Sequence, residues 1–251
     1  MKVVILAVGF VFLSFPALAG DAPPWVPEAH AESKSYVASI AIMSHSSKEG
    51  EISGAFYDLI RALDRVTNTQ TEIMWAPFKR SVRNLIEGKV DYHIPIIEAP
   101  NAKSEKLPYD FSTATLFKVA FVLYTNKNIS FDINDIEKYV IGTDLAHTDF
   151  FPFPTEGYNC LKCAIKMVNI GRIDGFIFAQ NEIDPFIVQY GLTNIRRQLY
   201  KVFLVKAIIP KGEVGKETDR HLSEGIRLLK ESGEYKKILK PVLVPYQDWQ
   251  P

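Results

Sequence analysis

One pattern of residues occurs twice in the chain and constrains its fold more than any other feature. Residues 85–96, LIEGKVDYHIPI, are echoed at residues 168–178, VNIGRIDGFIF. Each copy has an amphipathic run, a glycine, a basic residue, a β-branched residue, an aspartate and an apolar stretch. Glycine tolerates the left-handed backbone that ends a helix, and the basic residue suits the negative end of the helix dipole. Both copies therefore predict a helix, a glycine stop and a strand.

Two such units predict two α/β lobes of similar construction. Ligands of open α/β sheets lie at the carboxyl ends of the strands. We therefore look for function directly after each repeated strand, at residues 97–101 with Glu98 and at residues 179–182 with Glu182.

The first 19 residues have the features of a secretory signal peptide. Lys2 precedes an apolar run over residues 3–15, and Ala17-Leu18-Ala19 follows as a small-residue cleavage site. The run is too short to span a bilayer, and the alternative interpretation is a buried strand. The residue directly after the cleavage site is Gly20 and not a cysteine, so nothing indicates a lipid anchor. We expect export to the periplasm as a soluble monomer that begins at Gly20.

The charge pattern argues against a nucleic-acid partner. The chain has 29 basic and 29 acidic residues, and removal of Lys2 leaves it close to neutral. No basic block and no interleaved aromatic and basic stripe is present, and these are the usual marks of nucleic-acid binding.

Cys160 and Cys163 are the only cysteines and form a Cys-x-x-Cys motif. A thioredoxin-like motif requires the pair at a helix start just after a strand. The sequence instead predicts that Cys160 lies inside a helix over residues 156–170, which favours a local disulfide or two buried thiols. No recognisable spacing of further ligands indicates a metal site.

Apolar runs along the chain predict alternating strands and helices. We expect a first lobe of residues 20–115 and 202–251 and a second lobe of residues 116–201. Strands near 119–125 and 202–209 would join the lobes, and a double connection permits hinge closure around a ligand. The other expected elements are strands at 36–43, 71–75 and 140–143, helices at 53–66, 131–139, 183–190, 216–231 and 234–240, and a loop at 144–154.

In this order and spacing, four motifs resemble the family 3 periplasmic solute-binding proteins of ABC transporters. They are Gly54-Ala55-Phe56-Tyr57-Asp58-Leu59, Gly88-Lys89-Val90-Asp91, Tyr109-Asp110-Phe111-Ser112 and Gly171-Arg172-Ile173-Asp174. The resemblance covers essentially all of the chain after the signal peptide. It implies an α/β, two-lobed type II periplasmic binding protein fold, capture of a solute between closing lobes and delivery to a membrane permease.

The chain departs from the family at the ligand. Amino-acid binders of the family usually carry an arginine, a few residues before the Phe-Ser pair, that clamps the α-carboxylate. Here residues 98–106 hold Lys103 and Lys106 and no arginine, and a lysine lacks the planar two-pronged geometry. A standard amino acid is therefore not the expected ligand.

Several residues at predicted strand ends are candidate ligand contacts. Trp75 and Phe78 offer an aromatic platform, with a core role as the alternative, and Arg80 offers an anion contact unless it lies on the helix surface. For His147 the alternative is a loop histidine that is hydrogen-bonded within the protein. For Glu182 the alternative is a carboxylate that stabilises the dipole at the start of a helix. The full predicted contact set is Trp75, Phe78, Arg80, Glu98, Ser112, Thr143, Asp144, His147 and Glu182.

Three functions compete. The first is a solute-binding protein without chemistry or cofactor, which partners an ABC permease. The second is a dehydratase-like enzyme on the same fold, with Asp144, His147 and Glu182 as acid-base groups. The third is a sensory module that presents its ligand to a membrane receptor.

Overall fold

A computed structural model of the protein describes residues 34–42, 49–98 and 107–251, with the backbone alone for residues 49–53. The expected signal peptide, Gly20, Lys103 and Lys106 lie outside the described residues. Among the helices of the described part, none is long and apolar enough to cross a membrane.

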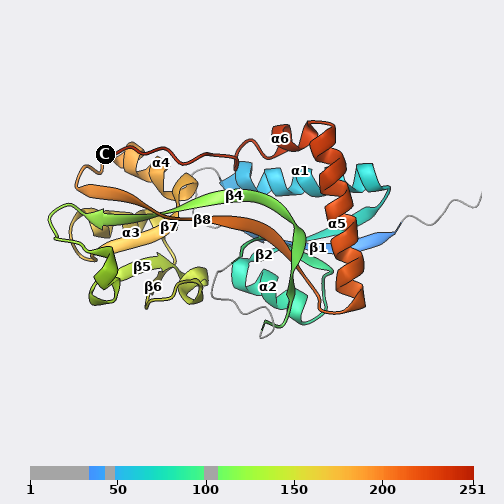
Figure 1. Cartoon of the computed structure of the whole chain (residues 1–251), viewed down its shortest axis with the longest axis horizontal. Helices are drawn as coiled ribbons and strands as arrows, with labels where there is room; N and C mark the ends of the chain where they lie inside the picture. Colours follow the sequence, from blue (N-terminus) through green and yellow to red (C-terminus); the bar gives the residue numbers. More distant parts are fainter. Residues whose placement is uncertain (1–33, 43–48, 99–106) are drawn as a thin grey trace, which may run out of the picture. The chain divides into compact units, whose positions relative to one another are not determined.

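The described strands form one mixed sheet with the order β2-β1-β3-β8-β4-β7-β5-β6. β1, β2 and β3 are parallel, as are β5, β6 and β7, and between these groups β8 and β4 run antiparallel to each other and to their outer neighbours. The sheet thus has two three-stranded parallel parts on either side of a central antiparallel pair (Figure 1). The strands are β1 (Ser35–Ile42), β2 (Gln70–Pro77), β3 (Tyr92–Ile97), β4 (Asp110–Asn126), β5 (Ile141–Asp144), β6 (Glu156–Tyr158), β7 (Gly175–Ala179) and β8 (Ile195–Ile209).

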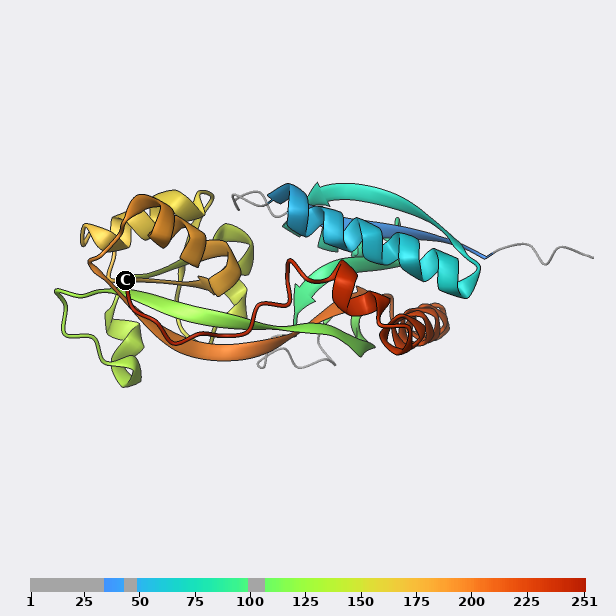
Figure 2. The ribbon, with the colours of Figure 1, turned by 90° about the horizontal axis from the view of Figure 1, so that it is seen from above.

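Helices flank both parts of the sheet. α1 and α5 lie against each other beside the β1 part, and α3 and α4 lie against each other beside the β7 part (Figures 1 and 2). The helices are α1 (Glu49–Thr67), α2 (Phe78–Ile86), α3 (Leu161–Asn169), α4 (Gln180–Tyr190), α5 (Glu213–Glu231) and α6 (Glu234–Ile238), with 3-10 helices η2 (Ile133–Lys138) and η3 (Leu145–Phe150).

The repeated sequence pattern forms the predicted helix, glycine stop and strand in both places. α2 is followed by Gly88 with φ 68° and then by β3, and α3 is followed by Gly171 with φ 73° and then by β7. A side chain at either position would strain this left-handed backbone. β3 and β7 occupy equivalent places, each directly beside the central antiparallel pair.

The two long central strands extend further than the predicted strands near 119–125 and 202–209. β4 begins at Asp110 and β8 at Ile195, and their pairing shifts register between Phe111 and Phe117 and again between Phe121 and Val122. Register shifts of this kind mark bulges, which bend and twist a strand. Residues 110–117 of β4 pair with the end of β8 that also pairs with β3, and residues 121–125 pair with β7. The register shifts lie within these two segments.

The predicted helix at 156–170 is wrong over its first five residues, 156–160. Residues 156–158 form β6, which pairs in parallel with β5, and α3 begins only at Leu161. Buried residues recur at helical spacing only from Leu161 onward, and strand pairing, which no local pattern encodes, decides the rest. Cys160 is consequently the N-cap of α3, joined to Cys163 by a disulfide. The predicted loop at 144–154 likewise contains η3.

Candidate functional site

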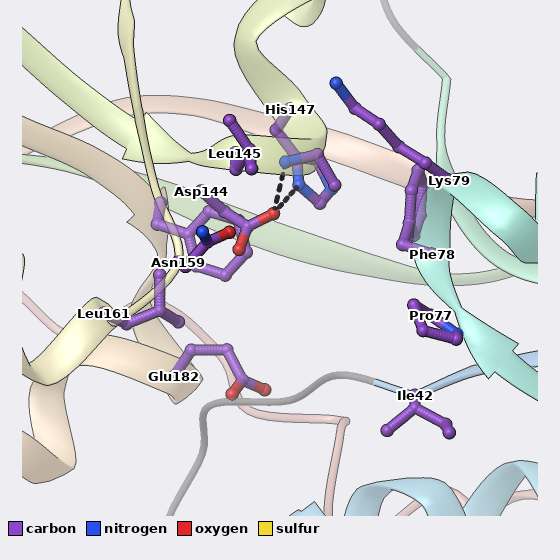
Figure 3. Close-up of a pocket in the computed structure, with 12 residues that line it drawn as sticks. Ile42, Pro77, Phe78, Lys79, Asp144, Leu145, His147, Asn159, Leu161 and Glu182 are labelled. Carbon is purple, nitrogen blue, oxygen red and sulfur yellow. Dashed lines mark hydrogen bonds and ion pairs between the residues drawn. The ribbon is translucent and has the colours of Figure 1, made fainter.

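A cavity of about 210 Å³ lies where the carboxyl ends of the parallel strands of both parts converge. Figure 3 shows Asp144, His147 and Glu182 on one side of it and Ile42, Pro77 and Phe78 on the other. The complete lining is Ile42, Pro77, Phe78, Lys79, Asp144, Leu145, Ala146, His147, Asn159, Leu161, Phe178 and Glu182.

A second, smaller cavity of about 50 Å³ adjoins the first. Phe78, His147 and Glu182 line both, and most other lining residues of the second cavity are apolar, among them Phe56 and Phe117. The two cavities together therefore combine an apolar inner wall with a few polar groups, the usual composition of a small-molecule site.

Phe78 supplies the aromatic wall because of the way β2 ends. Pro77 is the last residue of β2 and the N-cap of α2, and a residue without an N–H stops strand pairing there. Phe78 then opens α2; the residue is 9% exposed, and its ring lies 4.8 Å from the ring of His147. This contact joins the β2 side of the cavity to the η3 side.

Asp144 and His147 form a pair in the opposite wall. Asp144 ends β5 and caps η3, because its Oδ1 accepts a hydrogen bond from the Ala146 N–H at 2.8 Å. The same oxygen lies 3.0 Å from Nδ1 of His147, which is 4% exposed. The cap brings the imidazole, three residues later, back against the carboxylate and orients the ring.

Glu182 adds a second carboxylate to this wall. It lies in the first turn of α4, where the helix dipole favours a negative charge, and is 3% exposed. Asn181 donates its side-chain amide to Glu182 Oε1 at 3.3 Å. In Figure 3 the carboxyl group points toward the side of Ile42 and Pro77.

The structure brings four of the nine predicted contacts to the cavities, namely Phe78, Asp144, His147 and Glu182. The other five lie outside the linings. Trp75 is 44% exposed on β2, and Arg80 is exposed on α2. Ligand contact by these two stays a prediction.

Glu98, Ser112 and Thr143 have local partners instead. Glu98 lies 3.3 Å from Lys206 Nζ, and the buried Thr143 hydroxyl donates to the carbonyl of Ile177. Ser112 Oγ donates to the Ala114 carbonyl and accepts from the Ala207 N–H. These bonds tie strands together and hold the sheet that carries the cavity.

Sequence reasoning missed several lining residues. Ile42 is the last residue of β1, and Phe178 is the last but one of β7. Their place at strand ends could have indicated them, but the candidates were chosen among polar and aromatic residues that follow the strands. Asn159 was hidden by the wrong helix at 156–170, because its place after a strand was not recognised. Lys79, the cationic residue of the lining, is the neighbour of the predicted Arg80.

The lining includes no cofactor motif. Within residues 34–42, 49–98 and 107–251, no group of three or more His, Cys, Asp or Glu side chains is placed to hold a metal ion. The polar side chains of the first cavity are two carboxylates, an imidazole, an ammonium and the Asn159 amide around an apolar wall, a set suited to holding a small charged or polar molecule by hydrogen bonds.

A comparison with protein families identifies the family of this chain. Residues 37–243 match the bacterial extracellular solute-binding proteins, family 3. The chain belongs to this family. No curated protein sequence gives a match. The predicted resemblance is therefore confirmed, and membership in this family supports a solute-binding role.

Solved structures similar to this family 3 protein confirm the two-lobed type II periplasmic binding protein fold. A histidine kinase sensor domain with similarity to periplasmic binding proteins has 16% identity and a TM-score of 0.65, with 85% of this chain and 99% of that one covered. The glutamate-bound GluR0 ligand-binding core from Nostoc punctiforme has 16% identity and a TM-score of 0.62, with coverage of 83% and 99%. The arginine-, lysine-, histidine-binding protein ArtJ from Geobacillus stearothermophilus has 19% identity and a TM-score of 0.60, with coverage of 82% and 94%.

Proposed function

We propose that the protein captures a small solute in the two adjoining cavities, without chemistry on it, and delivers it to the permease of an ABC transporter. One observation carries this proposal: the cavity walls come from the carboxyl ends of strands in both parallel parts of the sheet. A molecule held there contacts both sides at once and draws them together. The lobes in this proposal are residues 20–115 with 202–251, and residues 116–201.

The lining favours an amphipathic solute with a hydrogen-bond-donating or cationic group. Phe78 and its apolar neighbours take the hydrophobic part, and Asp144 and Glu182 take the donor group. No arginine lines either cavity, and residues 43–48 and 99–106 contain none. Lys79 offers a carboxylate only a point charge, so a two-pronged carboxylate clamp is missing.

The cavity volume sets the size of the solute. About 210 and 50 Å³ are smaller than the roughly 300–1,000 Å³ of sites for drug-sized ligands. These volumes favour amines and small aromatic or branched solutes over peptides, and the missing arginine clamp argues against the standard amino acids.

Calorimetry with small amines, aromatic solutes, carboxylates and the twenty amino acids tests this proposal. For the solute that binds, Glu182→Gln is expected to weaken affinity by about tenfold or more, because a hydrogen bond to a charged group is replaced by a weaker one. Glu87→Gln is the matched control, since Glu87 is exposed and pairs with Lys89. Equal affinity of both variants and the wild type would place the solute elsewhere.

A sensory role is the second candidate, because a histidine kinase sensor domain is among the similar structures. In that role the bound lobes contact a membrane receptor in place of a permease. Neighbouring genes separate the two: permease and ATPase genes support transport, and a kinase or cyclase gene supports signalling.

Export as a soluble periplasmic monomer completes the proposal. It rests on the signal-peptide pattern of residues 1–19. N-terminal sequencing of periplasmic protein is expected to begin at Gly20, and a retained Met1 would contradict it.

A further inference from the structure

The Cys160–Cys163 disulfide has a setting that the solute-binding role does not use. Cys160 follows β6 and caps α3, and β7 follows α3, with β6 and β7 both parallel to β5. The motif thus lies at a helix start within a β-α-β unit, the context typical of redox-active Cys-x-x-Cys pairs.

The two cysteines differ in their exposure. Cys163 is exposed, whereas Cys160 is partly buried between the exposed Asn159 and the buried Leu161. Cys160 Sγ accepts a hydrogen bond from the Cys163 N–H at 3.3 Å. Its position at the helix N-terminus, with the basic Lys162 nearby in sequence, favours negative charge on that sulfur.

The disulfide contributes little that the fold requires. It joins residues three apart in sequence, and the stabilisation that a disulfide gives through chain entropy falls as the closed loop becomes shorter. The first turn of α3 is also held by the backbone bonds from the Cys163 and Ala164 N–H groups to the Cys160 carbonyl. Reduction therefore leaves α3 with its own hydrogen bonds.

From this geometry we propose that the pair is a thiol–disulfide exchange site for small-molecule thiols, in addition to the solute site. A thiolate attacks Sγ of the exposed Cys163 and bonds to it, while the Cys160–Cys163 bond breaks and its electron pair leaves on Cys160 Sγ. The hydrogen bond and the helix N-terminus stabilise this leaving thiolate.

A second thiolate then attacks the external sulfur of the mixed disulfide. A small-molecule disulfide leaves, and the electron pair remains on Cys163 Sγ. The two protons released by the small thiols end on the two protein thiols. In total, two small thiols are oxidised to a disulfide and the protein disulfide is reduced to a dithiol.

The exchange site adjoins the solute cavity. Asn159 and Leu161, on either side of Cys160, line that cavity (Figure 3). The exchange proposal rests on the cysteine geometry and not on the identity of the solute, so it stands or fails independently of the transport role.

Equilibration of the whole chain in mixtures of reduced and oxidised glutathione at pH 7 tests the proposal. Samples are quenched with acid, alkylated and mapped by mass spectrometry, with the Cys160→Ser/Cys163→Ser double variant as the blank for labelling. We expect reversible reduction with unchanged far-UV circular dichroism. At early times we expect the glutathione adduct on Cys163 and the alkylated free thiol at Cys160.

Three results would overturn the exchange site. The first is a disulfide that stays fully oxidised in reduced glutathione alone. The second is reduction only at urea concentrations that unfold the chain. The third is an early adduct on Cys160 instead of Cys163.

Discussion

At the scale of single residues, the aspartate of the repeated pattern has the same task in both places. Asp91 accepts a hydrogen bond from the Val37 N–H at 2.7 Å, and its own N–H donates to the Val37 carbonyl. Asp174 repeats this with Val140, whose N–H lies 2.8 Å from the carboxylate. Each aspartate thereby secures the neighbouring parallel strand, β1 or β5, near its start.

Asp91→Ala is expected to lower the free energy of unfolding by about 1–3 kcal/mol, because a charge-assisted hydrogen bond is lost. Asp174→Ala is expected to cost less, since Val140 is more exposed than Val37 and water replaces the carboxylate there. Urea unfolding measures both, with the exposed Asp58→Ala as control. A loss no greater than that of the control would refute the shared task.

A buried histidine links stability to pH. Burial lowers the pKa of His93 to about 3, and burial also lowers the pKa of His221. The unfolded chain takes up these protons near pH 6.5, where the folded His93 does not. The stability from neutral His93 is therefore complete above pH 6.5 and is lost as the pH falls toward 3, by at most about 1.4 kcal/mol per pH unit.

His93→Gln removes this titration. Between pH 4 and 6.5 the free energy of unfolding of the variant is expected to fall less steeply than that of the wild type, while above pH 7 the two curves run parallel. Urea unfolding across this range measures the slopes. Identical slopes below pH 6.5 would show that His93 titrates alike in both states.

At the scale of elements, the path of residues 239–251, the stretch after α6, was not predicted from the sequence. Residues 239–251 run back beside the start of β8 (Figure 2), where the Val244 carbonyl accepts a hydrogen bond from the Gln180 side chain and the Gln250 side chain bonds to the Arg197 backbone. The place of residues 202–251 in the first lobe stays a prediction. Arg197 is the anchor: it donates to the carbonyls of Gln247 and Trp249 and lies 4.4 Å from the Trp249 ring.

Arg197 also makes a two-pronged pair with Asp184, at 2.9 and 2.6 Å, and its side chain is fully buried. Arg197→Ala is expected to cost about 3–5 kcal/mol in the free energy of unfolding, because the carboxylate of Asp184 loses its partner in a largely buried place. Chymotrypsin should then cleave faster near Tyr246 and Trp249.

The neighbouring Arg196→Ala is the matched control, since Arg196 is exposed and its truncation is expected to change stability by no more than about 0.5 kcal/mol. Equal proteolysis rates in the two variants would show that Arg197 does not hold the stretch.

At the scale of the whole molecule, the central pair β4 and β8 connects the two proposed lobes. The register shifts between Phe111 and Phe117 lie in this connection. Strand pairing is interrupted there, so the strands bend more easily at this point than elsewhere. The cavity walls on either side can then approach each other around a solute.

A solute identified by calorimetry is expected to reduce the radius of gyration in X-ray scattering and to raise Tm. Binding to the folded state alone adds about 2.7 kcal/mol at a concentration of 100 times Kd. Phe78→Ala is expected to diminish both effects, because Phe78 lines both cavities. Tight binding with an unchanged radius would exclude lobe closure.

The repeated helix, glycine stop and strand, the two-part α/β architecture and the family could all be predicted from the sequence alone. The helix ends depend on local sequence, because Gly88 and Gly171 take a left-handed backbone with φ 68° and 73°. The tendency of ligands to lie at the carboxyl ends of strands also indicated Phe78, Asp144, His147 and Glu182.

Which of these residues lie together in the cavity depends on the tertiary structure. β6 exists because β5 pairs with it, the stretch after α6 is held by Arg197, and Trp75 is half-exposed beside a buried Phe78. Each outcome depends on contacts between residues far apart in the sequence. Such contacts override local preference because burial and pairing are worth more than the small intrinsic preferences of single residues for helix or strand.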